Sequence, residues 1–261
     1  MYFSRMFLKK IFSVKTLRKV PEITIFFWII KLLTTAVGES TSDFMVHHID
    51  PVIAVIIGFI GFVITIAFQF RVRKYIAWIY WLAVTMVAVF GTMAADVVHI
   101  VLGVPYLIST ICFAIALTII FVIWYKVERT LSIHSIINPR RELFYWLAII
   151  TTFALGTATG DMTAITLNLG YLTSGVLFAL IFAVPLVAYK IFKVNEVATF
   201  WAAYIVTRPL GASFADWLGR TPDLGGIGFG TGKTSIVLTI FIVIFVAFLT
   251  LSHVDIKGSK E

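Results

Sequence analysis

Hydrophobic residues in this chain form long, nearly unbroken stretches that are separated by short polar segments. Each stretch contains about 20 mostly apolar residues, which is the length that an α-helix needs to cross the hydrocarbon core of a bilayer. We predict eight membrane-spanning helices, at approximately residues 23–46, 51–70, 76–99, 104–125, 143–167, 170–191, 197–218 and 234–252. The expected fold is an all-α integral membrane protein, with one eight-helix membrane domain at 23–252, a basic arm at 1–22 and a tail at 253–261.

Composition supports this prediction, and the distribution of charge adds an orientation. Hydrophobic residues make up 60% of the chain and charged residues 13%, whereas soluble domains are nearer half apolar and a quarter charged. Most of the 21 lysines and arginines lie in the arm, in the tail and in the loops after the second, fourth and sixth predicted helices. The opposite loops contain only Arg220 and Lys233. By the positive-inside rule we expect a multi-pass protein of a bacterial inner membrane with both termini in the cytoplasm. Since this topology accounts for the net charge of +8, the expected partner is the lipid bilayer and not nucleic acid.

A pattern of three residues recurs four times along the chain. Each copy has a tryptophan, a glycine ten residues later and an aspartate five residues after the glycine. The copies are Trp28, Gly38 and Asp43; Trp81, Gly91 and Asp96; Trp146, Gly156 and Asp161; and Trp201, Gly211 and Asp216. The chain is therefore predicted to consist of four tandem two-helix repeats, at approximately 23–74, 75–139, 140–194 and 195–252. Because each repeat crosses the membrane twice, all four enter it in the same direction, and the four aspartates are expected at similar depth.

With this pattern, the sequence resembles a bacterial inner-membrane family built from four tandem repeats, each with two transmembrane helices and a characteristic tryptophan. The resemblance extends over essentially the whole chain after the basic arm. It implies the repeat architecture. It implies no activity and no cofactor, because that family has no assigned function.

The repeated aspartates also indicate which helices are central. The first helix of each repeat contains one of them, whereas the second helices contain no Asp or Glu, and their one basic residue, Lys190, lies at the loop end of the helix predicted at 170–191. A charge near the middle of a bilayer costs at least about 2.5–3.5 kcal/mol, so such residues face protein or a watery cavity. We therefore expect the first helices to form an inner ring and the second helices to face lipid. The four tryptophans, near the cytoplasmic ends of the first helices, are interpreted as an interfacial aromatic belt.

Several polar residues accompany the aspartates in the first helices. Glu39 lies four residues before Asp43, and the corresponding positions in the second and third repeats are threonines. The candidate ion-binding and metal-binding residues are Asp43, Asp96, Asp161, Asp216 and Glu39, and the residues expected to support them are Arg208, Lys31, Thr35, Thr92, Thr157 and His99. Carboxylates with threonine hydroxyls suit hard divalent cations, and a nearby imidazole shifts the preference toward Mn²⁺ or a later metal. The alternative is structural, with the carboxylates bracing helices or pairing with Lys31 and Arg208.

The five carboxylates against these two basic residues leave negative charge uncompensated, which favours a site for a cation. We therefore predict a membrane transporter for a small divalent cation, Mn²⁺ or similar, with no cofactor apart from the transported ion. The open alternatives are a cation or proton channel, a membrane-embedded enzyme, and a non-catalytic scaffold or sensor. We do not expect an enzyme, because the sequence has no HExxH motif and no Cys/His cluster. The segment GGIGFGTGKTS resembles a phosphate-binding loop, but Ile227 occupies the position where that motif requires glycine.

Overall fold

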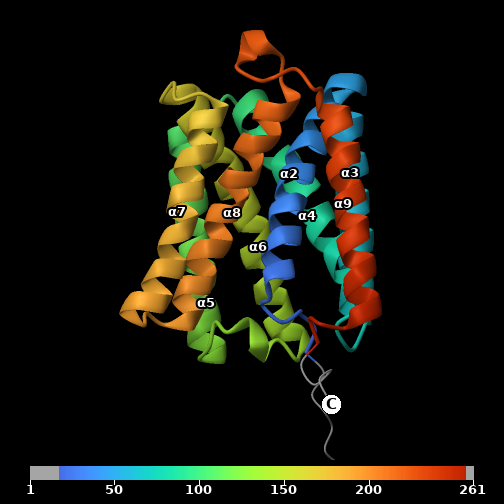
Figure 1. The fold of residues 1–261 in the computed structure, drawn as a ribbon, viewed down its shortest axis with the longest axis vertical. Helices are drawn as coiled ribbons and strands as arrows, with labels where there is room; N and C mark the ends of the chain where they lie inside the picture. Colours follow the sequence, from blue (N-terminus) through green and yellow to red (C-terminus); the bar gives the residue numbers. More distant parts are fainter. Residues whose placement is uncertain (1–17, 257–261) are drawn as a thin grey trace, which may run out of the picture.

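The computed structural model describes residues 18–256, which contain eight long helices and no strand (Figure 1). The predicted arm up to residue 17 and the tail from residue 257 lie outside the described residues. The long helices are α2 (Ile25–His48), α3 (Pro51–Arg71), α4 (Ala77–Asp96), α5 (Tyr106–Glu128), α6 (Pro139–Asp161), α7 (Tyr171–Phe192), α8 (Glu196–Gly219) and α9 (Thr231–Ser252). Short π-helical segments, η1 (Val97–Val101) and η3 (Met162–Thr166), continue α4 and α6, and 3-10 turns form η2 (Ile133–Ser135) and η4 (Pro222–Leu224).

Several long helices begin at a polar residue whose side chain satisfies free backbone N–H groups. Such caps begin α2, α3, α6 and α8, at Thr24, Asp50, Asn138 and Asn195. In α3 and α6 a proline follows the cap, where its missing N–H costs no hydrogen bond. These local signals set the helix starts within a few residues of those expected from hydrophobicity alone.

Six of the eight helices are long and apolar enough to cross a membrane, namely α3, α4 with η1, α5, α6 with η3, α7 and α9. The other two, α2 and α8, have 24 residues each and carry charged residues in their middle. These charges are buried within the protein, with Lys31 1%, Glu39 3% and Arg208 1% exposed. The prediction of an all-α membrane protein is confirmed.

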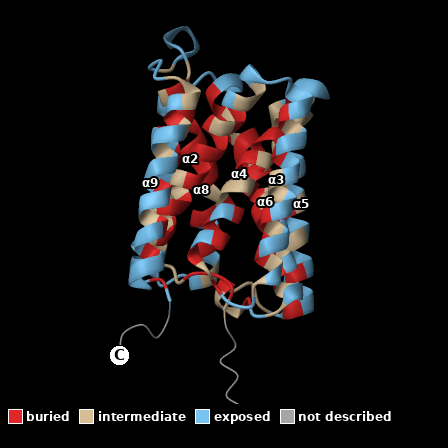
Figure 2. Ribbon diagram, turned by 90° about the vertical axis from the view of Figure 1, so that its right-hand side faces the viewer, coloured by how far each residue is buried: buried red, intermediate tan, exposed pale blue. Residues whose placement is uncertain are grey.

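The first helices of the four repeats form a closed ring. Around this ring α2 packs against α4, α4 against α6, α6 against α8, and α8 against α2. Figure 2 shows that buried residues concentrate in these four helices, whereas α3, α5 and α9 are mostly exposed. The predicted inner ring is therefore confirmed, and the second helices have exposed apolar outer surfaces of the kind that can contact lipid.

Neighbouring repeats interlock around the ring. Each second helix packs mainly against the first helix of the next repeat, so that α3 covers α4, α5 covers α6 and α7 covers α8. The last helix, α9, packs against α2 and closes the circle. As a result α2 begins and α9 ends at the same end of the bundle, which is the lower end in Figure 1.

The repeated glycines lie where the inner helices approach most closely. Each glycine faces the next inner helix around the ring, at the residue seven positions after the tryptophan of that helix. The pairs are Gly38 with Ala88, Gly91 with Phe153, Gly156 with Arg208 and Gly211 with Thr35. A Cβ added at Gly156 would lie 2.3 Å from Cγ of Arg208, and one at Gly211 would lie 1.9 Å from Oγ1 of Thr35. No larger residue fits without moving the helices apart, which is the physical reason for a glycine in every repeat.

The tryptophans form a ring of their own at the lower end of the bundle. The aromatic residue that precedes each tryptophan contacts the tryptophan of another repeat, in the pairs Phe27–Trp81, Tyr80–Trp146, Tyr145–Trp201 and Phe200–Trp28, with centroid distances of 5.6, 5.9, 6.2 and 5.7 Å. We call these eight residues the aromatic layer. The predicted interfacial belt is wrong for Trp81, Trp146 and Trp201, which are 1%, 5% and 4% exposed. They pack across the inner ring because each has an aromatic partner on a neighbouring helix.

Residues near the two ends of the described chain pack against this end of the bundle. Lys19, from the predicted basic arm, is buried and places Nζ 2.5 Å from Oε2 of Glu142. Oη of Tyr75 donates a hydrogen bond of 2.5 Å to Oδ2 of Asp255, which belongs to the predicted tail. Parts of both predicted terminal segments are therefore fixed to the membrane domain.

Candidate functional site

Arg208 of α8 lies in the interior of the inner ring and joins three repeats. Its Nη2 donates hydrogen bonds to Oε2 of Glu39 at 2.6 Å, to Oγ1 of Thr157 at 2.7 Å and to Oγ1 of Thr92. These three acceptors occupy the same repeat position, the residue directly after the repeated glycine. Glu39 therefore neutralises an arginine that only the fourth repeat provides, while the threonines complete the hydrogen bonds of that arginine.

Lys31 and Thr35 lie on α2 below this ion pair. The Nζ atom of Lys31 is 4.0 Å from the ring centroid of Phe153 and 4.1 Å from that of Tyr204. Within residues 18–256 no carboxylate lies at ion-pair distance from Lys31. The hydroxyl of Thr35 donates to the Leu32 carbonyl oxygen at 2.6 Å, and its own carbonyl oxygen accepts from Arg208. The predicted pairing of an acid with Lys31 is therefore wrong for the described residues, where two aromatic faces contact its ammonium instead.

Two of the repeated aspartates share one arginine. Arg220 directly follows α8, and its Nε lies 2.9 Å from Oδ1 of Asp216, while its Nη2 lies 3.0 Å from Oδ2 of Asp43. The ring of Tyr171 lies 5.5 Å from Cζ of the same guanidinium. The predicted position of Arg220 in an outer loop does not indicate this contact. The available signal was its spacing of four residues from Asp216, which places both on one helical face.

The other two repeated aspartates lie on the adjacent helices α4 and α6. Asp96 and Asp161 are partly exposed, and each is the last α-helical residue before a π-helical segment. The two helices that carry them pack against each other in the inner ring. In the described part of the chain neither has a lysine, arginine or histidine within ion-pair distance. Short π-helical segments inside helices are frequent at functional sites.

His99 lies in η1, one turn beyond Asp96. Its Nδ1 is 3.2 Å from the Val104 carbonyl oxygen and 3.3 Å from Oγ of Ser109, and its ring centroid is 4.3 Å from that of Tyr106. The residue is 9% exposed, and its Nε2 has no hydrogen-bond partner in the described structure. The imidazole is thus held in place through one nitrogen and has a free second nitrogen.

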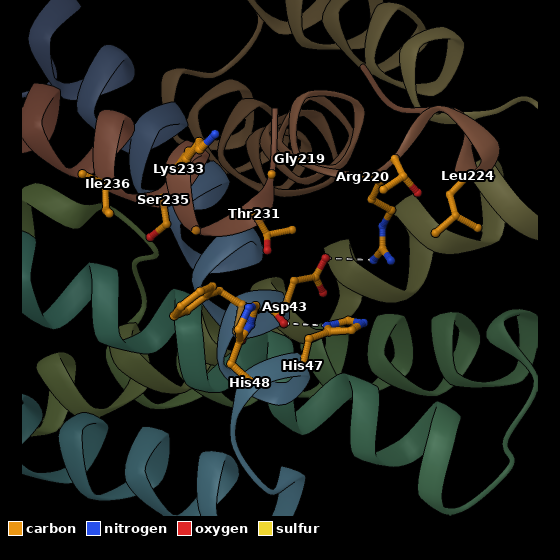
Figure 3. A pocket seen from close by; sticks show the side chains of 14 residues that line it. Asp43, His47, His48, Gly219, Arg220, Leu224, Thr231, Lys233, Ser235 and Ile236 are labelled. Carbon is orange, nitrogen blue, oxygen red and sulfur yellow. Dashed lines mark hydrogen bonds and ion pairs between the residues drawn. The ribbon is translucent and has the colours of Figure 1, made fainter. Parts of the chain in front are cut away.

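A pocket of about 750 Å³ opens at the upper end of the bundle, between the end of α2, the end of α8, η4 and the start of α9. Figure 3 shows the side chains of Asp43 and Arg220 pointing toward one another beside it. His47 and His48 also line the pocket. Each is hydrogen-bonded to the backbone of its own helix, with Nδ1 of His47 2.6 Å from the Asp43 carbonyl oxygen and Nδ1 of His48 2.8 Å from the Phe44 carbonyl oxygen. Of the four repeated aspartates, Asp43 lines this pocket, although it is only 5% exposed.

Three of the five predicted acids form a compact group. Within the described residues, oxygen atoms of Glu39, Asp43 and Asp216 lie within 4.8 Å of one another, which is close enough to hold a metal ion. Each of these carboxylates already contacts a guanidinium, whereas Asp96 and Asp161 lie outside the group. The structure thus divides the predicted set into three acids paired with arginine and two acids without a basic partner in the described residues.

Comparison with known proteins agrees with the repeat pattern. No curated protein and no solved structure matches the chain. A family model described as a repeat of unknown function, DUF347, matches four successive segments, at residues 26–75, 79–130, 144–195 and 199–255. Each matched segment contains one first helix with its Trp, Gly and Asp, together with the second helix that follows it. The chain contains four copies of this repeat and therefore belongs to the DUF347 repeat family.

Proposed function

We propose that this protein is a carrier that moves a small cation across a membrane, with the carboxylates of Asp96 and Asp161 as its cation-binding groups. The observation that supports this is the unequal compensation of four equivalent aspartates. In one half of the ring the Arg220 guanidinium lies between Asp43 and Asp216. In the other half the equivalent pair has no basic partner among the described residues. A bound cation would do for this second pair what Arg220 does for the first.

The ligand chemistry favours a divalent metal ion such as Mn²⁺. Two carboxylates provide hard oxygen ligands, and the free Nε2 of His99 lies on the segment that directly follows Asp96. Nitrogen ligation favours Mn²⁺ over Mg²⁺ and Ca²⁺, which prefer all-oxygen sites. These residues therefore suit a transported metal ion, and we propose no bound cofactor.

The interior of the ring supports a carrier over an open channel. Below the aspartates, the buried ammonium of Lys31, which has no carboxylate at ion-pair distance in the described residues, would repel a cation that moved along the axis. Farther down, the contacts of the aromatic layer join all four repeats. A cation would therefore need a rearrangement of the inner helices to cross, as alternating access provides. With the orientation inferred from the basic residues, in a bacterial inner membrane, the pocket would face outward and the aromatic layer would face the cytoplasm.

Transport by purified protein in liposomes tests this function. We expect the wild type to move Mn²⁺ into vesicles loaded with a metal-sensitive dye, and Asp96→Asn or Asp161→Asn to abolish the uptake. Asp223→Asn provides a matched control, because Asp223 is an exposed aspartate at the same end of the bundle. The proposal would be overturned by a wild type that moves no divalent cation, or by uptake in both Asn variants equal to that of the control.

A further inference from the structure

We propose that Arg220 is a built-in counter-cation that keeps Asp43 and Asp216 from binding a transported ion, and so limits the aspartate ring to one metal ion per molecule. This inference rests on the proposed function, because it concerns the same ring of carboxylates. It assigns Arg220 the role of a positioning residue that determines how many cations the carrier accepts.

The geometry of Arg220 is that of a bridging ion. Two different nitrogens of one guanidinium contact carboxylates from two repeats, at 2.9 Å to Asp216 and 3.0 Å to Asp43. An oxygen of Glu39, a third carboxylate, lies within 4.8 Å of an oxygen of each of these two aspartates. Without the positive charge of Arg220, these carboxylates would be close together with too little compensation, which is the arrangement that binds a divalent cation.

The chain holds Arg220 firmly in this position. Its carbonyl oxygen accepts a hydrogen bond of 2.9 Å from the Gly228 N–H, and the neighbouring loop bonds back to the end of α8, through Ile227 N–H to the Trp217 oxygen at 2.8 Å. A Cβ at Gly226 would lie 2.0 Å from the Arg220 oxygen, so only glycine allows the loop to fold so closely. Tyr171 packs against the guanidinium from α7. Arg220 is therefore a fixed part of the site.

Only the fourth repeat supplies such a cation. Four residues after the repeated aspartate, the first three repeats have His47, Ile100 and Ile165. The Arg220 side chain is 22% exposed and lines the 750 Å³ pocket, so water and ions can reach the place that it occupies. Removing the guanidinium should thus open a second ion site in the half of the ring where the wild type has none.

Metal stoichiometry of the full-length protein tests this inference. Equilibrium dialysis against radioactive Mn²⁺ is expected to give one ion for the wild type and two for Arg220→Gln. Lys233→Gln is the matched control, because Lys233 is a basic residue of the same pocket with no carboxylate at ion-pair distance in the described chain, and it should bind one ion. Adding Asp43→Asn to Arg220→Gln should return the count to one.

The outcomes separate this inference from the function on which it rests. A wild type that binds no Mn²⁺ would overturn the proposed function. A wild type and an Arg220→Gln variant that both bind one ion would overturn the role of Arg220 alone. If Arg220→Gln does not fold, Arg220→Ala removes the same charge and should also bind two ions, whereas Arg220→Lys keeps the charge and should bind one. A Lys variant that binds two ions would contradict the inference.

Discussion

The buried pair of Arg208 and Glu39 allows the clearest prediction about stability. Changing Glu39 to Gln leaves an uncompensated guanidinium inside the ring, and breaking a buried ion pair in this way costs about 3–5 kcal/mol. Because Thr92 and Thr157 still accept hydrogen bonds from Nη2, we expect the low end of that range, about 3 kcal/mol. At about 2–4 °C for each kcal/mol, Tm should fall by about 6–12 °C.

The double variant Glu39→Gln/Arg208→Met provides the control for this prediction. It removes both charges and keeps most of the buried volume, and such replacements are often neutral. We therefore expect its Tm to lie close to that of the wild type. Thermal unfolding of the detergent-solubilised protein, followed by tryptophan fluorescence, measures both. A single variant with an unchanged Tm, or a double variant no more stable than the single one, would show that the pair does not stabilise the ring.

Two further predictions concern the lower end of the bundle. Burial raises the pKa of Asp255 above the ordinary aspartate value. The stability that protonated Asp255 contributes is therefore present at low pH and is lost as pH rises from the ordinary aspartate pKa through the raised value. Asp255→Asn should remove this pH dependence from a plot of Tm against pH. A profile equal to that of the wild type would contradict the prediction. In the aromatic layer, Trp81→Ala should cost about 3–5 kcal/mol of unfolding free energy, because the ring is fully buried. Trp28→Ala should cost less unfolding free energy, because Trp28 is only partly buried. Equal losses of unfolding free energy for the two variants, measured by denaturant unfolding, would argue against the aromatic layer.

The sequence predicts the helices and their arrangement in a ring well, because both follow from properties of single helices. Apolar length determines which segments cross the membrane, and the intramembrane aspartates determine which helices are central. The common position of Glu39, Thr92 and Thr157 was also visible in the repeats. Their convergence on Arg208 was not, because it depends on how four helices rotate about their axes when the ring closes.

Contacts between repeats account for the parts that the sequence did not predict. The burial of Trp81 depends on Phe27, which lies far away in the chain and next to it in the ring. The bridge from Arg220 to Asp43 likewise needs α8 to lie beside α2, which only the closed circle brings about. The division of the acids into a compensated and an uncompensated half could therefore be recognised only in the structure.

The most direct test of the central claim is the binding of Mn²⁺ to the variant Asp96→Asn/Asp161→Asn. We expect this protein to fold and to bind no Mn²⁺ in equilibrium dialysis, whereas the wild type and the Asp223→Asn control bind one ion each. Mn²⁺ binding by the double variant with wild-type affinity and stoichiometry would contradict the claim that these two carboxylates form the cation site.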